Sequence, residues 1–502
     1  MNVSLNELHQ KVDAHPELYA EGDAFSPQKS LLDALYEEGM IPTYSFPKDV
    51  VSTYIEDENG ALLQQVDRGL DMAISEYAPG RAIVVDKKTY VIGGFYVHHE
   101  SRFNFRQASQ YLEDPNYTKS IKKCTSCGWF GFSDELNEDK CPFCRKNTIE
   151  PMPPMVRPWG FSPRDNRPEP ENVSEEYSTI STPLYSTLPD ESSLENIRGY
   201  SAVRKAVRQD QRIILVNRGN EDKGFTICKS CGAAVPGNNA EKLKNRKRPG
   251  AGIHVPCRHD NTMNIVLGYD FLTDMLVLTF DLPKSEVESQ TIDAKTWMQR
   301  AGTTVAEALR KAATRLLDVE YDEIQAGYRI REDEANTSID VYLYDNLSSG
   351  AGYSTQLGEK TEELLQSALN LLEDCDCDHA CQKCLKHYRN QYIQVNLDRH
   401  AAIELIKYGQ NRHIPEVLDT DHALDSLIRI ERLLRENGIR MEHNPQEIKL
   451  INRQKMKTCV VYPSMMRCPS EWRADSHVPV TIEALNDAKP YALATIMKSM
   501  QI

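Results

Sequence analysis

Cysteine is the residue type whose spacing carries the clearest chemistry in this sequence. Eleven of the 13 cysteines fall into three clusters, and only Cys459 and Cys468 stand apart. In a reducing compartment thiols stay free, so clustered cysteines indicate metal ligands rather than disulfides. The three clusters therefore predict two to three structural Zn²⁺ ions. Cys459 and Cys468 are interpreted as buried free thiols, with pairing across a hairpin as the alternative.

The first cluster is a pair of CxxC knuckles. Its four thiols are those of Cys124, Cys127, Cys141 and Cys144. Two knuckles at this spacing can place four thiolates tetrahedrally around one zinc ion, and Gly128 and Pro142 suit the tight turns. A site closed by four sulfurs has no open coordination position, so it is structural. The alternative is four free thiols.

The second cluster combines a CxxC knuckle with a later cysteine and a histidine. Cys228 and Cys231 form the knuckle, and Cys257 is flanked by His254 and His259. Three cysteines and either histidine would complete a Cys₃His site, and the spacing leaves the choice of histidine open. A degenerate knuckle without metal is the alternative.

A basic insertion separates the two halves of the second cluster. It can grip phosphates, although a solvated loop explains it equally well. Its cations are Lys242, Lys244, Arg246, Lys247 and Arg248.

The third cluster packs four cysteines into ten residues. These are Cys375, Cys377, Cys381 and Cys384, with His379 as a spare candidate ligand. Such dense spacing does not fit a regular helix, but it can fold around one ion as a compact knob.

Cations and aromatic residues follow directly behind this cluster. The mixture can hold phosphates and stack on exposed bases, while a helix that packs its tyrosines into the core is the alternative. The residues are Lys383, Lys386, His387, Tyr388, Arg389, Tyr392 and Arg399. From this set and the basic insertion we predict DNA contacts at Lys383, Lys386, Tyr388, Arg389 and the five cations of residues 242–248.

Several motifs of catalysis are missing from the sequence. It contains no GxxxxGK[ST] phosphate loop. The Asp333-Glu334-Ala335 stretch is interpreted as a charged turn, and NLSSGAGY (346–353) as a strand-to-helix turn. Asp274 and Asp345 offer carboxylates to a metal, but such residues more often cap helices. We therefore expect that the chain is not an enzyme by itself.

The elements that position these residues follow from periodicity. Helices are expected near 28–38, 303–319, 354–374, 398–410 and 422–437. IVV and TYVI around DKK predict a hairpin, RIILV and MLVLTF predict strands between 200 and 285, and SIDVYLYD predicts another strand. Seven prolines in residues 151–170 predict an extended arm or linker. The fold class is α+β and multidomain, with zinc-ribbon and zinc-knuckle modules on mixed β/α domains and a helical C-terminal part.

Length and composition limit the possible classes of protein. A chain of 502 residues is expected to form two to four domains. With 40% hydrophobic and 26% charged residues it is typical of a soluble globular protein. No apolar run is long enough to cross a bilayer and the first residues lack a signal-peptide pattern, so a cytoplasmic protein without membrane contact is expected. The net charge of −15 restricts any nucleic-acid contact to local sites.

Composition shifts and motifs suggest six segments. They are an N-terminal α/β region (1–115), a zinc ribbon (116–150), a proline-rich arm (151–175), a β-rich region with the second cluster (176–300), a four-cysteine zinc domain (301–415) and a helical extension (416–502).

The third cluster and its surroundings resemble a known family. VYLYDNLSSGAGYSTQL, CDCDHACQKCLKHYRNQY and LDRHAAIEL are similar to the MrfA-like zinc-binding (MZB) domain, and upstream segments such as ISEYAPGRAIVVDKKTYVIGG extend the likeness to residues 30–410. In this family a strand ends in an aspartate and a glycine-rich turn, here Asp345 and Gly350-Ala351-Gly352. Ser348-Ser349-Gly350 stands where the family has a double glycine.

The resemblance implies a function. MZB domains occur at the C-terminus of superfamily-two DNA helicases in repair and phage defence, and as a separate subunit in the DISARM defence system. It implies a zinc-binding, motor-less accessory subunit of an ATP-dependent DNA helicase or translocase, with DNA, a helicase/ATPase motor protein and further defence-system subunits as partners. The alternative is a scaffold that links a helicase to a nuclease or methylase without contacting DNA.

Overall fold

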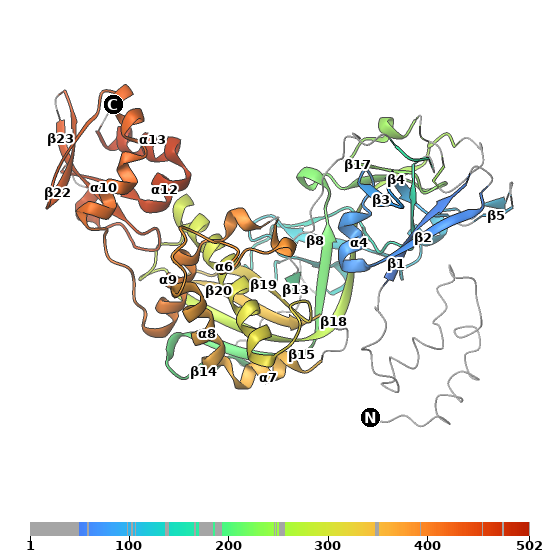
Figure 1. Ribbon diagram of the computed structural model, residues 1–502, viewed down its shortest axis with the longest axis horizontal. Coiled ribbons are helices and arrows are strands. Elements are labelled where there is room, and N and C mark those ends of the chain that lie inside the picture. The colour runs from blue at the N-terminus through green and yellow to red at the C-terminus, as the bar shows by residue number, and fades with distance from the viewer. Residues whose placement is uncertain are drawn as a thin grey trace.

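The computed structural model shows three regions that follow one another along the long axis of the molecule (Figure 1). An N-terminal sheet region lies at one end, a large sheet covered by helices lies in the centre, and a C-terminal lobe lies at the other end. The structure describes residues 50–500 except 58–59, 98, 102–103, 106, 136–139, 165–166, 170–183, 186–192, 245, 247, 250–256, 347–350, 392, 454 and 474–475. The helix predicted at 28–38 lies outside these residues.

The N-terminal sheet has five strands in the order β2-β1-β12-β4-β3. The predicted hairpin is confirmed as β3 and β4, whose turn residues Asp86 and Lys87 have φ of 49° and 63°. Two left-handed residues are what a tight two-residue hairpin requires. The elements of this region are β1 (Val50–Glu56), β2 (Leu62–Gly69), α4 (Leu70–Glu76), β3 (Ala82–Val85), β4 (Lys88–Phe95), β5 (His99–Ser101), β6 (Asn104–Phe105), α5 (Ser109–Leu112) and β12 (Phe161–Pro163).

The proline-rich stretch is extended, as predicted, but it is not a free linker. Its strands join three different sheets. β10 (Ile149–Pro151) belongs to the zinc ribbon, β11 (Met155–Val156) pairs within the central sheet, and β12 pairs within the N-terminal sheet. Proline favours extended backbone without preventing neighbouring residues from pairing. The arm therefore fastens the first two regions together.

The central sheet is built on two long strands, β15 (Tyr200–Asn217) and β18 (Thr262–Pro283), which pair antiparallel. These confirm the strands expected between 200 and 285. SIDVYLYD is confirmed as part of β20 (Asn336–Asp345), which pairs with β18 and with β19 (Ile324–Glu332). The smaller strands of the centre and the ribbon are β7 (Thr118–Lys119), β8 (Ile121–Cys124), β9 (Phe130–Phe132), β13 (Leu184–Tyr185), β14 (Glu195–Ile197), β16 (Phe225–Cys228) and β17 (Ala234–Pro236).

Four helices cover the central sheet. The longest, α6 (Ile292–Leu317), begins where Thr291 caps the Ala294 amide and ends at the left-handed Asp318. It begins earlier than the predicted 303–319 and ends two residues sooner. It packs closely on β19, where a Cβ at Gly302 would lie 2.4 Å from the Tyr328 ring. The helix expected over 354–374 is broken at Lys360 into two. The other three are α7 (Tyr353–Glu359), α8 (Thr361–Glu373) and α9 (Arg399–Asn411).

The C-terminal part is not helical throughout, and that expectation is wrong. It contains a four-stranded sheet. In two of its strands buried residues alternate with less buried ones, a period of two that indicates strands; the buried residues include Ile448, Leu450, Cys459 and Val461. Its elements are α10 (Thr420–Ile428), α11 (Glu431–Glu436), β21 (Arg440–Asn444), β22 (Glu447–Asn452), β23 (Lys455–Tyr462), β24 (His477–Thr481), α12 (Ile482–Asp487) and α13 (Lys489–Met500).

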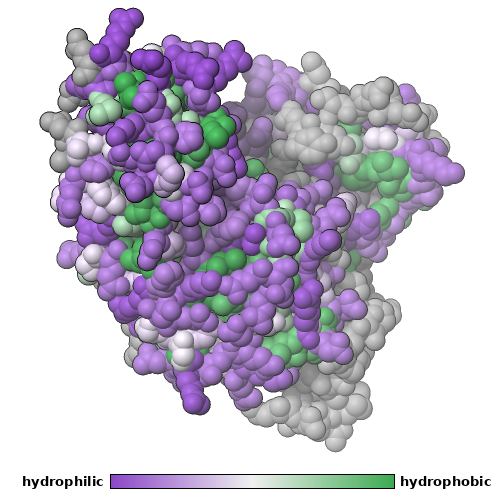
Figure 2. All heavy atoms as spheres, turned by 60° about the vertical axis from the view of Figure 1, so that its left-hand side comes forward, coloured by the Kyte–Doolittle hydropathy of each residue, from purple (hydrophilic) through white to green (hydrophobic). Residues whose placement is uncertain are grey.

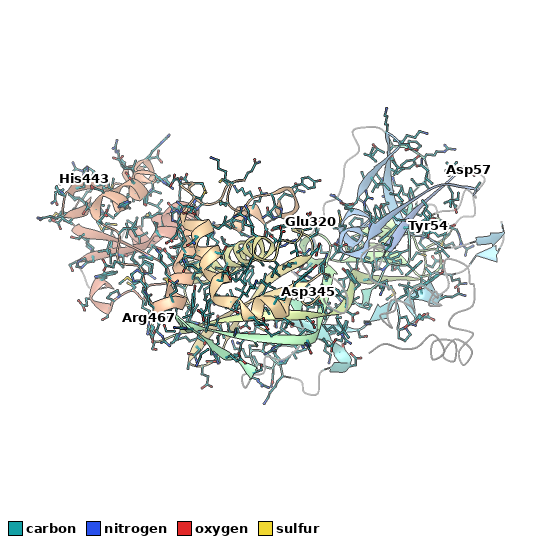
Figure 3. The ribbon with its side chains drawn as sticks, turned by 60° about the horizontal axis from the view of Figure 1, so that its bottom comes forward. Tyr54, Asp57, Glu320, Asp345, His443 and Arg467 are labelled. Atoms are coloured by element: carbon teal, nitrogen blue, oxygen red, sulfur yellow. The ribbon has the colours of Figure 1, made fainter. Side chains whose placement is uncertain are left out.

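The C-terminal lobe is firmly seated on the centre. Met465 is buried in the central core, and the amide of Glu288 donates to its carbonyl oxygen at 2.9 Å. Arg467, labelled in Figure 3 at the boundary of the lobe, donates from Nη1 to the carbonyl of Ser285 at 3.2 Å. The surface turned forward in Figure 2 is mainly polar, with separate apolar patches.

Candidate metal centres and nucleic-acid interface

The structure brings all three cysteine clusters together as four-ligand groups, whose ligand atoms lie within 4.8 Å of one another. The nearest sulfur pairs are 3.5–3.6 Å apart in the first cluster, 3.7 Å in the second and 3.4–3.7 Å in the third. A tetrahedron with Zn–S bonds of about 2.3 Å places its sulfurs about 3.8 Å apart, whereas a disulfide needs about 2.05 Å. The donor atoms therefore fit zinc, and all 13 cysteines are free thiols.

The first cluster is held by two knuckles with the same backbone geometry. The amide of Gly128 donates to the carbonyl of Cys124 at 2.9 Å, and the amide of Arg145 to that of Cys141 at 3.0 Å. Gly128 and Arg145 both have left-handed φ, 73° and 59°. These bonds turn the chain so that each pair of sulfurs faces the other pair.

The first cluster is fastened to the central sheet by a side-chain contact. The Arg329 guanidinium of β19 lies 3.8 Å from the centre of the Phe143 ring, which belongs to the second knuckle. Both residues are buried. A cation over an aromatic face in a desolvated position stabilises such a contact by about 2 kcal/mol.

His259 completes the second cluster. Its Nδ1 lies 3.5 Å from the Cys231 sulfur, and its Nε2 lies 2.9 Å from the carbonyl oxygen of Arg246. A proton on Nε2 serves that hydrogen bond and leaves Nδ1 as the metal-binding nitrogen. A left-handed φ of 55° lets a histidine two positions after Cys257 turn back to the same ion. His254 lies outside the described residues.

The second cluster is also a joint between two regions of the molecule. The Phe95 amide of β4 donates to the Gly232 carbonyl at 2.9 Å, and the Ser109 amide to the Lys229 carbonyl at 2.7 Å. The backbones approach so closely that a Cβ on Gly94 would lie 2.2 Å from the Gly232 oxygen. The knuckle thus joins the N-terminal sheet to the central sheet.

The third cluster is supported by two cations from neighbouring helices. Arg399 donates from Nε to the Cys377 carbonyl at 2.5 Å, while Lys311 donates from Nζ to the carbonyls of Lys383, at 3.1 Å, and Cys384. Partial burial lowers the pKa of Lys311. His379 lies 3.3 Å from the Asp398 carboxylate, so it supports the loop as a side chain beside the cluster.

A buried carboxylate holds the segment behind the third cluster. Glu307 accepts hydrogen bonds from Asn390 Nδ2 at 2.9 Å and Tyr321 OH at 3.0 Å, and lies 3.2 Å from His387 Nε2. Burial raises the pKa of Glu307, but these polar partners outweigh burial and hold the pKa below its ordinary value. Sequence reasoning missed Glu307 and Lys311, since their only signal is a charged residue within an alanine-rich helix.

The predicted DNA-contact residues fall into two groups. Behind the third cluster, Lys383 is exposed, Lys386 is half-buried and Tyr388 is 84% exposed. This excludes the alternative in which Tyr388 packs into the core. The side chain of Arg389 and all of Tyr392 lie outside the described part, and Arg399 supports the cluster as above.

The 242–248 loop offers less free charge. Lys244 lies 2.6 Å from the Glu241 carboxylate, and Arg246 and Arg248 are half-buried. Lys242 is exposed, and it lines a surface pocket with Lys223 and Asn239. Lys247 lies outside the described residues.

The acidic residues of the predicted caps and turn have structural roles, and Asp274 accepts from the amide of Asp210 at 3.4 Å. Asp345 accepts from the amides of Ala351 at 2.6 Å and Ser354 at 2.9 Å, so it caps the turn into α7 (Figure 3). Asp333 accepts from the amides of Ala335 and Asn336 within the β19–β20 turn. Both match the capping and turn interpretations.

The chain is an α+β protein with three groups of cysteine and histidine ligands that fit structural zinc ions. Residues 305–385, which include the whole third cluster, match the family described as the MrfA Zn-binding domain, MZB. This confirms the resemblance for that segment. The chain is also similar to Druantia protein DruE of Escherichia coli (strain UMEA 4076-1), with 29% identity over 93% of this chain. The aligned part is 27% of that relative, so the chain spans about a quarter of its length.

Solved structures of another protein are similar in part. A crystal structure of the DUF1998 helicase MrfA bound to DNA matches with 10% identity and a TM-score of 0.35, over 81% of this chain and 39% of that one. The complex with DNA and AMPPNP matches at 0.27, over 79% and 40%. Likeness at this level carries no argument about function. Among the described residues, no helix combines the length and apolarity needed to span a bilayer.

Proposed function

We propose that this chain is the zinc-binding accessory part of an ATP-dependent DNA helicase or translocase, acting in bacterial antiviral defence. The observation that carries the proposal is the MZB match at 305–385 within an alignment to a Druantia protein along nearly the whole chain. Because that relative is much longer, we assign the ATP-hydrolysing motor to polypeptide outside these 502 residues. A Druantia-like setting is favoured over a DISARM-like one by the name of the relative.

The zinc sites support a role in holding and presenting surfaces. All three groups consist of four protein ligands, which leaves no open position for a reacting water. Metal binding then stabilises loop-rich modules that have small cores of their own. We assign DNA contact to the face behind the third cluster, where cations and Tyr388 are accessible.

A scaffold that never touches DNA is the second candidate. The net charge of −15 favours it, because phosphates are repelled from most of the surface. A free proline-rich arm could lie along a partner and would favour a scaffold, but the strands of this arm are built into three sheets. The two candidates differ in whether DNA binding weakens when Lys383 and Lys386, on the face behind the third cluster, are replaced.

Co-purification tests the proposal. The tagged chain is expressed with its neighbouring genes, and the proteins it retains are identified by mass spectrometry. We expect a protein with a phosphate loop, and we expect it to remain bound when Lys383 and Lys386 are both changed to Glu. Lys295→Glu with Lys498→Glu is the matched control, since both lysines are exposed on other faces. If no ATPase is retained by the wild-type chain, the proposal is wrong.

DNA binding by the same preparations separates the two candidates. If the chain is a DNA-binding accessory part, Lys383→Glu with Lys386→Glu weakens DNA binding, while Lys295→Glu with Lys498→Glu leaves it unchanged. If all preparations bound DNA equally, or none bound it, the scaffold would be favoured.

A further inference from the structure

The segment behind the third cluster displays the two most exposed large apolar side chains in the described part of the chain. Tyr388 is 84% exposed and Val395 is 77% exposed. Each stands on a short 3₁₀ turn, η6 (Tyr388–Asn390) and η7 (Gln394–Asn396). Single exposed apolar side chains are common on protein surfaces, but here two of them stand on turns that are hydrogen-bonded to each other, on a segment that also carries lysines.

These turns are held firmly although their tips are exposed. Asn390 is buried between the Glu307 carboxylate and the Leu385 carbonyl, and its Nδ2 lies 2.9 Å from both acceptors. Gln394 ties η7 to η6 by donating to the carbonyl of His387 at 2.9 Å and to Asn390 Oδ1 at 3.1 Å. The Tyr388 ring is therefore presented by a preorganised support, which reduces the entropy lost on binding.

The charges around the ring select a ligand with local negative charge. Lys383 is exposed and Lys386 half-buried on the same segment, and no hydrogen bond or ion pair from either ammonium occurs among the described residues. Asp374, Asp376 and Asp378, which directly precede or separate the first cysteines of the cluster, are exposed carboxylates. A long run of phosphates would meet these carboxylates, so contact is limited to about two phosphates.

We propose that Tyr388, with Val395 on the adjoining turn and Lys383 and Lys386 shortly before it on the same segment, forms a stacking site for one or two unpaired bases of single-stranded DNA. This rests on the proposed function and specifies its substrate class. A tyrosine face stacks on any base, and the two ammonium groups hold the adjoining phosphates. Duplex DNA offers no exposed base face, and its two strands of phosphates need a longer basic track than this knob provides.

Fluorescence anisotropy with the zinc-loaded full chain tests the site. The probes are a fluorescein-labelled oligothymidine of 12 nucleotides and a labelled hairpin duplex. We expect Tyr388→Ala to weaken binding of the single strand at least about fivefold, and Tyr388→Phe to keep the affinity within about twofold, since the ring remains. Tyr491→Ala, at a half-exposed tyrosine of the C-terminal lobe, is the control and changes nothing. Zinc content and circular dichroism verify that each variant is folded.

Salt dependence separates stacking from charge. With two phosphates neutralised, the log–log slope of affinity against salt for the single strand is expected to be about −1.4. Tyr388→Ala keeps that slope, whereas Lys383→Ala with Lys386→Ala reduces it toward zero.

The outcomes distinguish this inference from the proposed function. If the duplex binds as well as the single strand, or if Tyr388→Ala binds the single strand like wild type, the stacking site is wrong while DNA contact stands. If Tyr388→Ala instead loses the co-purifying ATPase with single-strand binding unchanged, the face docks protein and the inference is overturned. If the wild-type chain binds neither DNA, both the inference and the DNA contact fail, and the scaffold remains.

Discussion

The second and third zinc sites use the same chemistry in opposite surroundings. At the second site Cys228 and Cys231 are buried, and backbone amides from the N-terminal sheet bond to the knuckle itself. At the third site only Cys384 is buried, and the chain behind it projects Tyr388 and Val395 into solvent. The second site is a joint between sheets, and the third is a support for an exposed face. Ligand count alone therefore does not reveal what a structural zinc site does.

Removal of one ligand from each site should have the largest effect, and the two removals should expose different parts of the chain. Structural zinc contributes on the order of 10 kcal/mol to the folding of a small module. Cys231→Ser is expected to abolish protection of the Phe95 and Ser109 amides from hydrogen exchange, since both donate to the second knuckle. Cys384→Ser should leave these two amides protected and expose the residue 375–399 segment. Loss of protection at Phe95 in both variants would contradict the distinction.

Removal of the buried carboxylate under the third site should be the next largest effect. Glu307→Ala leaves the partners of a buried charge unpaired, so unfolding of the central region is expected to require about 3–5 kcal/mol less free energy. Urea denaturation measures the change. Glu320→Ala, at an exposed residue just beyond α6 (Figure 3), is the control and should cost less than about 0.5 kcal/mol. Equal losses in the two variants would show that Glu307 does not hold the face.

Two half-buried residues, Glu404 and Glu483, make the seat of the C-terminal lobe dependent on pH. Burial raises the pKa of Glu404 on α9 to about 8 and that of Glu483 on α12 to about 7. The Glu483 carboxylate raises the pKa of Glu404 further, and Asp398 raises both pKa values. Glu404 accepts from Trp297 Nε1 at 2.8 Å, Glu483 from Ser464, and Asp293 from Thr481. The nearby cation Arg300 lies 3.8 Å from Asp398.

The sign of this dependence follows from the raised pKa values. The protonated carboxyls are favoured in the folded state, so their stability is complete below about pH 4.5 and is lost as pH rises through 7 to 8. Between pH 6 and 9 the unfolding free energy should fall by about 3 kcal/mol from Glu404 alone. Glu404→Gln should remove most of that fall, as measured by urea unfolding followed through Trp297 fluorescence. A profile as steep in Glu404→Gln as in wild type would rule this out.

Loss of the Lys311 contact with the third site should lower the stability least of the changes considered. Lys311→Met removes the ammonium that donates to two carbonyls of the cluster, at an expected cost of about 1–2 kcal/mol. Zinc should be released to a chelator several times faster from this site. Lys295→Met, on the exposed part of the same helix, should release zinc at the wild-type rate.

The sequence predicted the metal groups well and their surroundings poorly. CxxC spacing is local, and the turns of the first cluster each close within five consecutive residues, 124–128 and 141–145, so the first two clusters were visible without any knowledge of the fold. The contrast between joint and support depends on long-range contacts, such as Phe95 with Gly232 and Glu307 with Asn390, which leave no trace in spacing. The C-terminal sheet was missed for a different reason: its strands are short, and the helical period of residues 422–437 was extended over them.

DNA-stimulated ATP hydrolysis shows whether this chain acts as the accessory part of an ATP-driven motor. The purified zinc-loaded chain is added in increasing amounts to the co-purified motor protein with single-stranded DNA present, and the rate is compared with each protein alone. We expect no hydrolysis by this chain alone and a saturable increase in the rate of the motor, which Tyr388→Ala reduces. Hydrolysis by this chain alone, or a motor rate that does not change when the chain is added, would show that it is not an accessory subunit.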